Sequence, residues 1–192
     1  MAPPYKPETP SRFQKQSPSV GNCSAVDVTL RVLLFAASLS AVVVMVTSKE
    51  TKLVALPVPP FSVKIPSKFT YSPAFIYFVV ALSVAVAHSF ITTLVSLSVM
   101  AKQVFPKRVL LLLAFCDVVM LGLVGSATGA SSAVAYIGLK GNNHTGWSEI
   151  CSVYGKFCRH IGAASAVALV ASILLMLLSV LSTYSLYKRV RD

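Results

Sequence analysis

Four apolar runs dominate this chain of 192 residues, and each is about 20 residues or longer. In a bilayer, an α-helix of about 20 residues crosses a hydrocarbon core of about 30 Å and satisfies its own backbone hydrogen bonds. The sequence therefore predicts an all-α membrane protein, a bundle of four transmembrane helices within residues 24–188. The predicted spans are 28–47, 73–100, 108–129 (with helix continuing as far as residue 139) and 161–184.

The composition supports membrane insertion and argues against a nucleic-acid partner. Hydrophobic residues make up 55% of the chain and charged residues only 12%, whereas a soluble domain has about 25% charged residues. The formal net charge is +11, but most Lys and Arg residues flank the apolar runs. Because basic flanks set membrane topology and contact anionic headgroups, we expect membrane lipid rather than nucleic acid as a partner.

The polar segments between the runs define the rest of the chain. Residues 1–23 are rich in Pro, Ser and Lys and predict a disordered tail. The sequence Ser24–Asp27 resembles a capping box at the start of the first helix. Residues 48–72 predict a basic, Pro-rich loop, residues 140–160 predict a polar loop, and residues 189–192 form a second tail.

Four spans place both termini on one side of the membrane. The loop between the second and third runs and the C-terminal tail are short and densely basic. Short basic flanks stay in the cytoplasm. We therefore expect cytoplasmic termini, with loops 48–72 and 140–160 on the outer side.

The second outer loop carries two cysteines and a glycosylation motif. Cys151 and Cys158 both face the oxidising side, so we expect them to form a disulfide. Residues seven apart in a straight helix lie about 10.5 Å apart, beyond the reach of about 7 Å between disulfide Cα atoms, so the loop must bend, and Gly155 offers the place. A zinc site with His144 and His160 is the alternative, although that spacing fits no common zinc pattern. Asn143 begins an N-glycosylation motif.

Arg31 in the first run and Asp117 in the third are the charges hardest to place, since a charge at membrane depth costs roughly 2.5–3.5 kcal/mol. The two spans run parallel, and helical side chains lean toward the helix N-terminus. The carboxylate of Asp117 therefore points back toward the cytoplasmic face, where the long side chain of Arg31 can reach it. We predict an intramembrane pair that sets the register of these helices. Two alternatives stay open: Asp27 and the interface can satisfy Arg31, and Asp117 can be protonated.

His88 is a further ionisable group at depth, near the middle of the second run. Its neighbours Ser89, Thr92 and Ser96 favour a hydrogen-bonded packing role. A relay with Asp117 would instead indicate an ion or proton channel or transporter, which we keep as the alternative function.

Small residues follow one face of each of the last two runs. Such residues let helices approach closely in lipid, and they serve either packing within the chain or lateral assembly. The expected packing residues are Gly122, Gly125 and Gly129 in the third run, and Ala164, Ala168 and Ser172 in the fourth.

Enzyme motifs are missing from the sequence, which contains no C-x-x-C, no H-E-x-x-H and no Gly-rich phosphate loop. We therefore expect a protein that is not an enzyme, with no catalytic residue, no metal and no cofactor.

Several stretches resemble the plant Casparian strip membrane domain proteins and their CASP-like relatives, in particular the CASP-like subfamily 1, which are related to the four-helix MARVEL membrane proteins. The resemblance covers all four spans and is most specific between Asp117 and Cys158. The matching stretches are LRVLLF (30–35), VVMVTSK (43–49), FCDVVM (115–120) and AYIGLKGN (135–142), followed by Trp147, Cys151 and Cys158.

The resemblance implies a MARVEL-like multi-pass protein of the plasma membrane, and it marks Arg31 and Asp117 as family hallmarks. It implies a scaffold that forms homo- and hetero-oligomers with itself and related members, organises a membrane domain and recruits cell-wall-modifying enzymes. The first-loop signature of the founding members is absent from residues 48–71. We expect the outer-loop interaction surface to include Trp147 and Tyr154.

Overall fold

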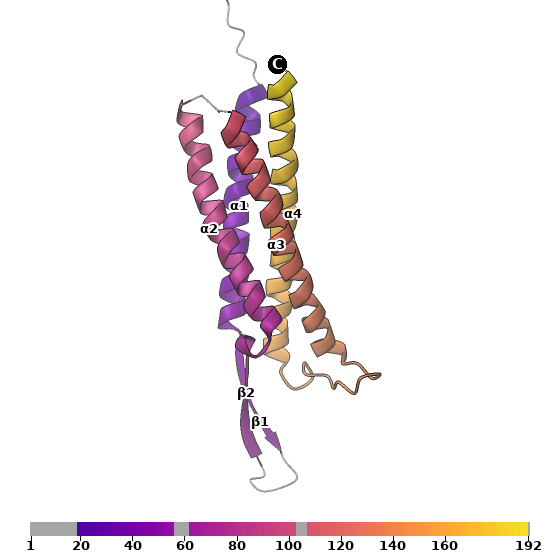
Figure 1. Ribbon diagram of the computed structural model, residues 1–192. Coiled ribbons are helices and arrows are strands. Elements are labelled where there is room, and N and C mark those ends of the chain that lie inside the picture. The colour runs from indigo at the N-terminus through magenta and orange to yellow at the C-terminus, as the bar shows by residue number, and fades with distance from the viewer. Residues whose placement is uncertain (1–18, 56–61, 103–106, 192) are drawn as a thin grey trace, which may run out of the picture.

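The computed structural model describes residues 19–55, 62–102 and 107–191, and it consists of four long helices and one hairpin (Figure 1). All four helices are long and apolar enough to cross a membrane, which confirms the predicted four-helix membrane fold. The elements in chain order are α1 (Ser19–Thr47), β1 (Lys49–Ala55), β2 (Ser62–Lys68), η1 (Phe69–Tyr71), α2 (Pro73–Lys102), α3 (Lys107–Lys140) and α4 (Gly155–Arg191).

The start of α1 and the end of α4 lie at the same end of the bundle (Figure 1), here called the terminal end. Neighbouring helices pack in the order α1–α2–α3–α4 and back to α1, so α1 and α3 face each other across the interior. The opposite end of the bundle carries the hairpin and the loop between α3 and α4, and it is here called the loop end.

The starts of α1 and α4 differ from the sequence prediction, whereas α3 ends one residue beyond the predicted residue 139. α1 begins at Ser19, so the predicted capping box at Ser24 is wrong, because Ser24 lies inside the helix. Residues 19–23 of the predicted disordered tail are likewise helical, and residues 1–18 lie outside the described residues. α3 continues to Lys140, where Gly141 ends it with a φ of 65°, as glycine commonly does after a helix. α4 begins at Gly155 rather than near residue 161.

The segment between α1 and α2 contains a β-hairpin, where the sequence predicted only a loop. β1 and β2 pair antiparallel, from Lys49 opposite Lys68 to Ala55 opposite Ser62. Strand-favouring residues such as Thr51, Val54 and Val63 lie in these strands. The two strands project from the loop end, beyond the helices (Figure 1).

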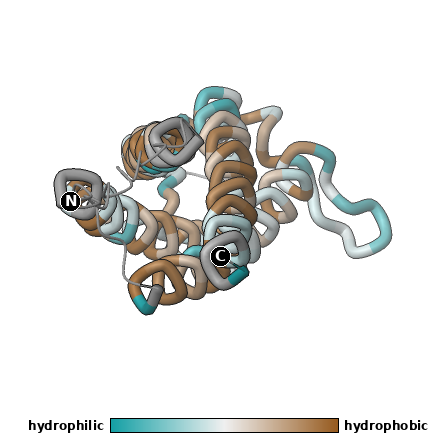
Figure 2. The backbone as a smooth tube through the Cα atoms, turned by 90° about the horizontal axis from the view of Figure 1, so that it is seen from above, coloured by the Kyte–Doolittle hydropathy of each residue, from teal (hydrophilic) through white to brown (hydrophobic). Residues whose placement is uncertain are grey.

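The interior of the bundle is apolar over most of its length, and large apolar side chains also cover its outside. Figure 2, seen along the bundle, shows hydrophobic colours over the helices and hydrophilic colours at the loop between α3 and α4. Such an exterior suits lipid, whereas a soluble protein rarely exposes large apolar patches. The buried core includes Leu34, Phe78, Leu82, Val124, Ala168 and Leu175, and the exposed side chains include Leu33, Val80, Leu111, Phe115 and Val180.

Candidate functional site

A bidentate ion pair joins α1 and α3 across the interior of the bundle. Arg31 donates from Nη1 to Oδ1 of Asp117 at 3.3 Å and from Nη2 to Oδ2 at 3.0 Å. Both residues are completely buried. Because both carboxylate oxygens accept from the guanidinium, the geometry is that of an ionised carboxylate rather than a protonated one.

Arg31 has a second carboxylate partner on its own helix. Its Nε donates to Oδ2 of Asp27 at 3.0 Å, in the i,i+4 geometry that stabilises helices. Ser96 on α2 donates to the same oxygen at 3.0 Å. The two partners that the sequence offered as alternatives for Arg31 therefore bind it together, and Ser96 attaches α2 to the network.

His88 is a direct partner of Asp117. Its Nε2 lies 2.9 Å from Oδ1 of Asp117, and since an ionised carboxylate only accepts, Nε2 is the donor. The His88 side chain is 13% exposed, whereas that of Asp117 is fully buried. The sequence favoured a packing role for His88 among serine and threonine side chains and offered a relay with Asp117 only as the alternative, because a contact between two helices leaves no local signal.

The four charged and titratable groups form one network, which we call the buried ionic network: Asp27, Arg31, His88 and Asp117, with Ser96 at its edge. It joins α1, α2 and α3. Removing one partner from a buried ion pair costs about 3–5 kcal/mol because the other charge stays buried and unpaired. The network is therefore a strong restraint on how these three helices align.

α4 is attached to the bundle by small residues instead. Ala164, Ala168 and Ala171 are fully buried, and Ser172 is half-buried. The predicted small-residue face of this helix thus packs within the chain.

The glycine face of α3 does not pack within the chain. A Cβ placed on Gly122, Gly125 or Gly129 would meet no atom within 4 Å, apart from the helix itself and adjacent residues. Gly122 and Gly129 are exposed. This face, which we call the open glycine face, therefore has room for added side chains, and Ser126 beside the glycines contacts Tyr77 of α2 at 2.8 Å. The sequence pattern alone does not distinguish it from the small residues of α4, because both sets are spaced three or four positions apart.

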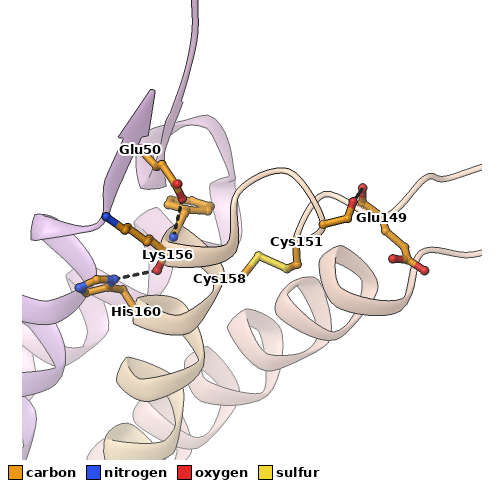
Figure 3. The surroundings of a disulfide bond; sticks show 8 residues. Glu50, Glu149, Cys151, Lys156, Cys158 and His160 are labelled. Carbon is orange, nitrogen blue, oxygen red and sulfur yellow. Dashed lines mark hydrogen bonds between the residues drawn. A yellow bond between two sulfur atoms is a disulfide. The ribbon is translucent and has the colours of Figure 1, made fainter. Parts of the chain in front are cut away.

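At the loop end, a disulfide joins Cys151 and Cys158 (Figure 3). Their Cα atoms lie 5.7 Å apart, because residues 151–153 form a turn before α4 begins at Gly155. The backbone N–H groups of Ile150 and Cys151 donate to the carbonyl of Gly138 at 2.9 and 3.1 Å. The loop is thus tied to both α3 and α4, and its two cysteine sulfurs are not free to bind a metal.

Glu50 of β1 reaches the first turn of α4 (Figure 3). Its carboxylate accepts the backbone N–H of Phe157 at 2.9 Å and pairs with Lys52 at 3.3 Å. Unpaired N–H groups at a helix start favour a negative partner, and the Phe157 hydrogen bond accordingly lowers the pKa of the Glu50 carboxyl. Sequence reading missed this contact because 107 positions separate its partners.

The remaining predicted outer-loop residues differ in exposure. Asn143 and Trp147 are exposed, with Trp147 at 57%. Tyr154 is only 9% exposed and belongs to the core, so it presents no free ring to a partner and is wrong as an outer-surface residue. Among the described residues, no three His, Cys, Asp or Glu side chains are grouped to hold a metal.

Comparison with known proteins identifies the family. Residues 21–174 match the model of the Casparian strip membrane protein domain. The chain is 50% identical over 194 residues to CASP-like protein 1D1 of Populus trichocarpa, covering 99% of both chains. It is 54% identical over 171 residues to CASP-like protein 1D1 of Arabidopsis thaliana, covering 88% of both. No solved structure matches. The predicted resemblance is therefore confirmed, and this multi-pass membrane protein belongs to the Casparian strip membrane protein domain family.

Proposed function

We propose that this protein is a non-enzymatic scaffold of the plasma membrane, which assembles laterally with itself and with related family members. Its termini lie in the cytoplasm, and its loop end faces the cell wall, where it organises wall-modifying partners. The observation that carries this proposal is the open glycine face of α3, formed by Gly122, Gly125 and Gly129.

The lipid environment explains why this face matters. Lipid tails are as apolar as leucine, so helices associate there through close packing rather than through hydrophobic burial. Small residues that pack against nothing within the chain leave a shallow surface that a second helix fills at short distance. The buried ionic network supports the same reading, because its groups bind one another and hold α1, α2 and α3 in a fixed arrangement.

The loop end supplies the surface for partners in this proposal. Trp147 is exposed on a loop that the disulfide ties to α4, and exposed aromatic residues are frequent anchors in protein interfaces. Asn143 on the same loop is the proposed glycosylation site, and its exposure suits that modification.

Native mass spectrometry from detergent or nanodiscs tests the assembly. Gly122→Leu with Gly129→Leu is expected to shift the wild-type oligomer to monomer, since leucine keeps helices apart. The matched control is Ala163→Leu with Ala166→Leu on the exposed side of α4, which should leave the oligomer intact. A monomeric wild type, or an oligomer that survives the glycine changes, contradicts the proposal.

A second candidate function is ion or proton transport, favoured by the contact between His88 and Asp117 at 2.9 Å and the partial exposure of His88. Flux into liposomes that His88→Gln abolishes would establish transport. Equal flux in empty liposomes and in liposomes with the protein would reject it.

A further inference from the structure

The hairpin has two chemically different faces, which its register defines. Side chains alternate between the faces of a strand, and residues directly opposite each other share a face. Lys49 lies opposite Lys68, and Leu53 lies opposite Lys64 four pairs further along. These three lysines therefore share one face, which we call the lysine face.

The other face is turned toward α4. Glu50 lies on it, 9% exposed, and accepts the N–H of Phe157 at 2.9 Å. Lys52, two residues along the same face, pairs with Glu50 at 3.3 Å. The only carboxylate of the described hairpin residues is thus occupied at α4, and the lysine face is left without an anion.

The lysine face is open to its surroundings. The side chains of Lys49, Thr51, Leu53, Lys64 and Lys68 are all exposed. Like charges directly opposite each other destabilise a sheet, and Lys49 lies opposite Lys68 here. An anion that bridges the two ammonium groups removes this repulsion.

We propose that the lysine face binds an acidic polysaccharide, an extended polymer of uronic acids, on the outer side of the membrane. The placement of the hairpin on the outer side of the membrane rests on the orientation given under the proposed function. Ammonium groups act as point charges suited to single carboxylates, whereas recognition of phosphate usually draws on the bidentate fork of arginine, and the described hairpin residues include no arginine. Lysine also binds phosphate as a point charge, so we commit to a polymer of carboxylates as the occupant, and binding to phosphate-bearing vesicles instead is an outcome that overturns this choice.

The geometry favours an extended polymer over a membrane surface. The strands lead away from the helices (Figure 1), and Lys64 lies four residues along β2 from Lys68, a distance of about 13 Å. Headgroups can reach the two lysines at the base, but a flat bilayer cannot also reach Lys64. A linear polyanion lying along the strands can contact all three.

A second copy of the hairpin is a poor occupant of this surface. Two lysine faces repel each other, and Pro66 removes one backbone donor from β2. Lysine and proline at exposed strands are common devices against strand-to-strand association.

The test is binding of the full chain in neutral-lipid nanodiscs to immobilised, de-esterified polygalacturonate, measured by biolayer interferometry. The wild type should bind at 50 mM NaCl and lose binding at 500 mM, because exposed charge pairs are screened by salt. Lys49→Gln/Lys64→Gln/Lys68→Gln should weaken binding about tenfold. Fully methyl-esterified polygalacturonate, which lacks the charge, should not bind.

The matched control removes the same number of charges from the same end of the bundle: Lys140→Gln/Lys156→Gln/Arg159→Gln, all at exposed positions. This control should change the affinity less than twofold. Equal loss in both triple variants, or wild-type binding to phosphatidylserine vesicles but not to polygalacturonate, overturns the proposal. Both the terminal end and the loop end of the bundle are accessible to the polymer in a nanodisc. The measured binding therefore depends neither on the orientation in the cell nor on lateral assembly. Failure of this proposal is thus distinguishable from failure of the scaffold proposal.

Discussion

Neutralising Asp117 is the sharpest perturbation of the buried ionic network. The Asp117 carboxylate accepts two hydrogen bonds from Arg31 and one from His88 in a fully buried position. Removing one partner of a buried ion pair costs about 3–5 kcal/mol. In Asp117→Asn the amide oxygen still accepts one bond, so we expect a loss of about 3 kcal/mol in the free energy of unfolding. In Asp117→Ala nothing replaces the carboxylate, and we expect about 5 kcal/mol.

The assay is reversible unfolding by sodium dodecyl sulfate in mixed micelles. Energy transfer between dyes on Ala25→Cys in α1 and Arg108→Cys in α3, both at exposed positions, reports the separation of these helices. The neutral control is Ser131→Ala, which removes a buried hydroxyl contact of 3.3 Å with Ser165. Hydrogen bonds between membrane helices average about 0.6 kcal/mol, so the control should lose less than 1 kcal/mol.

A double-mutant cycle separates the ion pair from other effects. Arg31→Gln alone should also destabilise the bundle strongly, because it leaves Asp117 buried without its cation. With both changes no charge is left unpaired between α1 and α3, so the double variant should lose at least 2 kcal/mol less than the sum of the single variants. Single losses below 1 kcal/mol, or strict additivity, would refute the reasoning.

Three further predictions concern single contacts elsewhere in the bundle. Glu50→Gln should speed exchange of the Phe157 amide hydrogen. Because this contact lowers the pKa of Glu50, the wild-type protection should hold at pH 5.5 and be lost only at a pH below the ordinary titration range of a glutamate. Equal exchange in both proteins would refute this prediction. Ser38→Ala should leave the unfolding free energy unchanged or raise it, since Ser38 Oγ is buried without a partner among the described residues; a loss above 1 kcal/mol would contradict this. Gly141→Ala should destabilise the loop end, because Gly141 has a φ of 65° and an added Cβ would lie 2.7 Å from the carbonyl oxygen of Trp147. Faster proteolysis of residues 142–154 is the readout. Gly146→Ala is the control, because Gly146 also has a positive φ but an added Cβ would meet no atom there.

The helices were predictable because hydropathy and length are local properties. A run of about 20 apolar residues needs no knowledge of its neighbours to form a helix in lipid. The proximity of Arg31 and Asp117 was predictable from the same hydropathy pattern, since parallel spans with known starts fix the depth of each residue in the membrane. The start of α4 was less predictable, because this helix begins at Gly155, near the Glu50 contact and outside the apolar run.

Contacts between segments that are distant in the sequence could not be predicted from hydropathy and length. The hairpin consists of two seven-residue strands in a Pro-rich segment, where the alternation is short and weak. The bond from His88 to Asp117 depends on how α2 rotates against α3. Tyr154 lies in a polar loop by sequence, yet packs into the core because the turn before α4 points it inward. Each of these outcomes depends on tertiary packing, which a single sequence does not display.

The most direct test of the scaffold proposal is the lateral mobility of a fluorescently tagged copy in a plant plasma membrane, measured by fluorescence recovery after photobleaching. We expect a large immobile fraction for the wild type and fast, complete recovery for Gly122→Leu/Gly129→Leu at the same expression level. Complete recovery of the wild type at the rate of the glycine variant would contradict it.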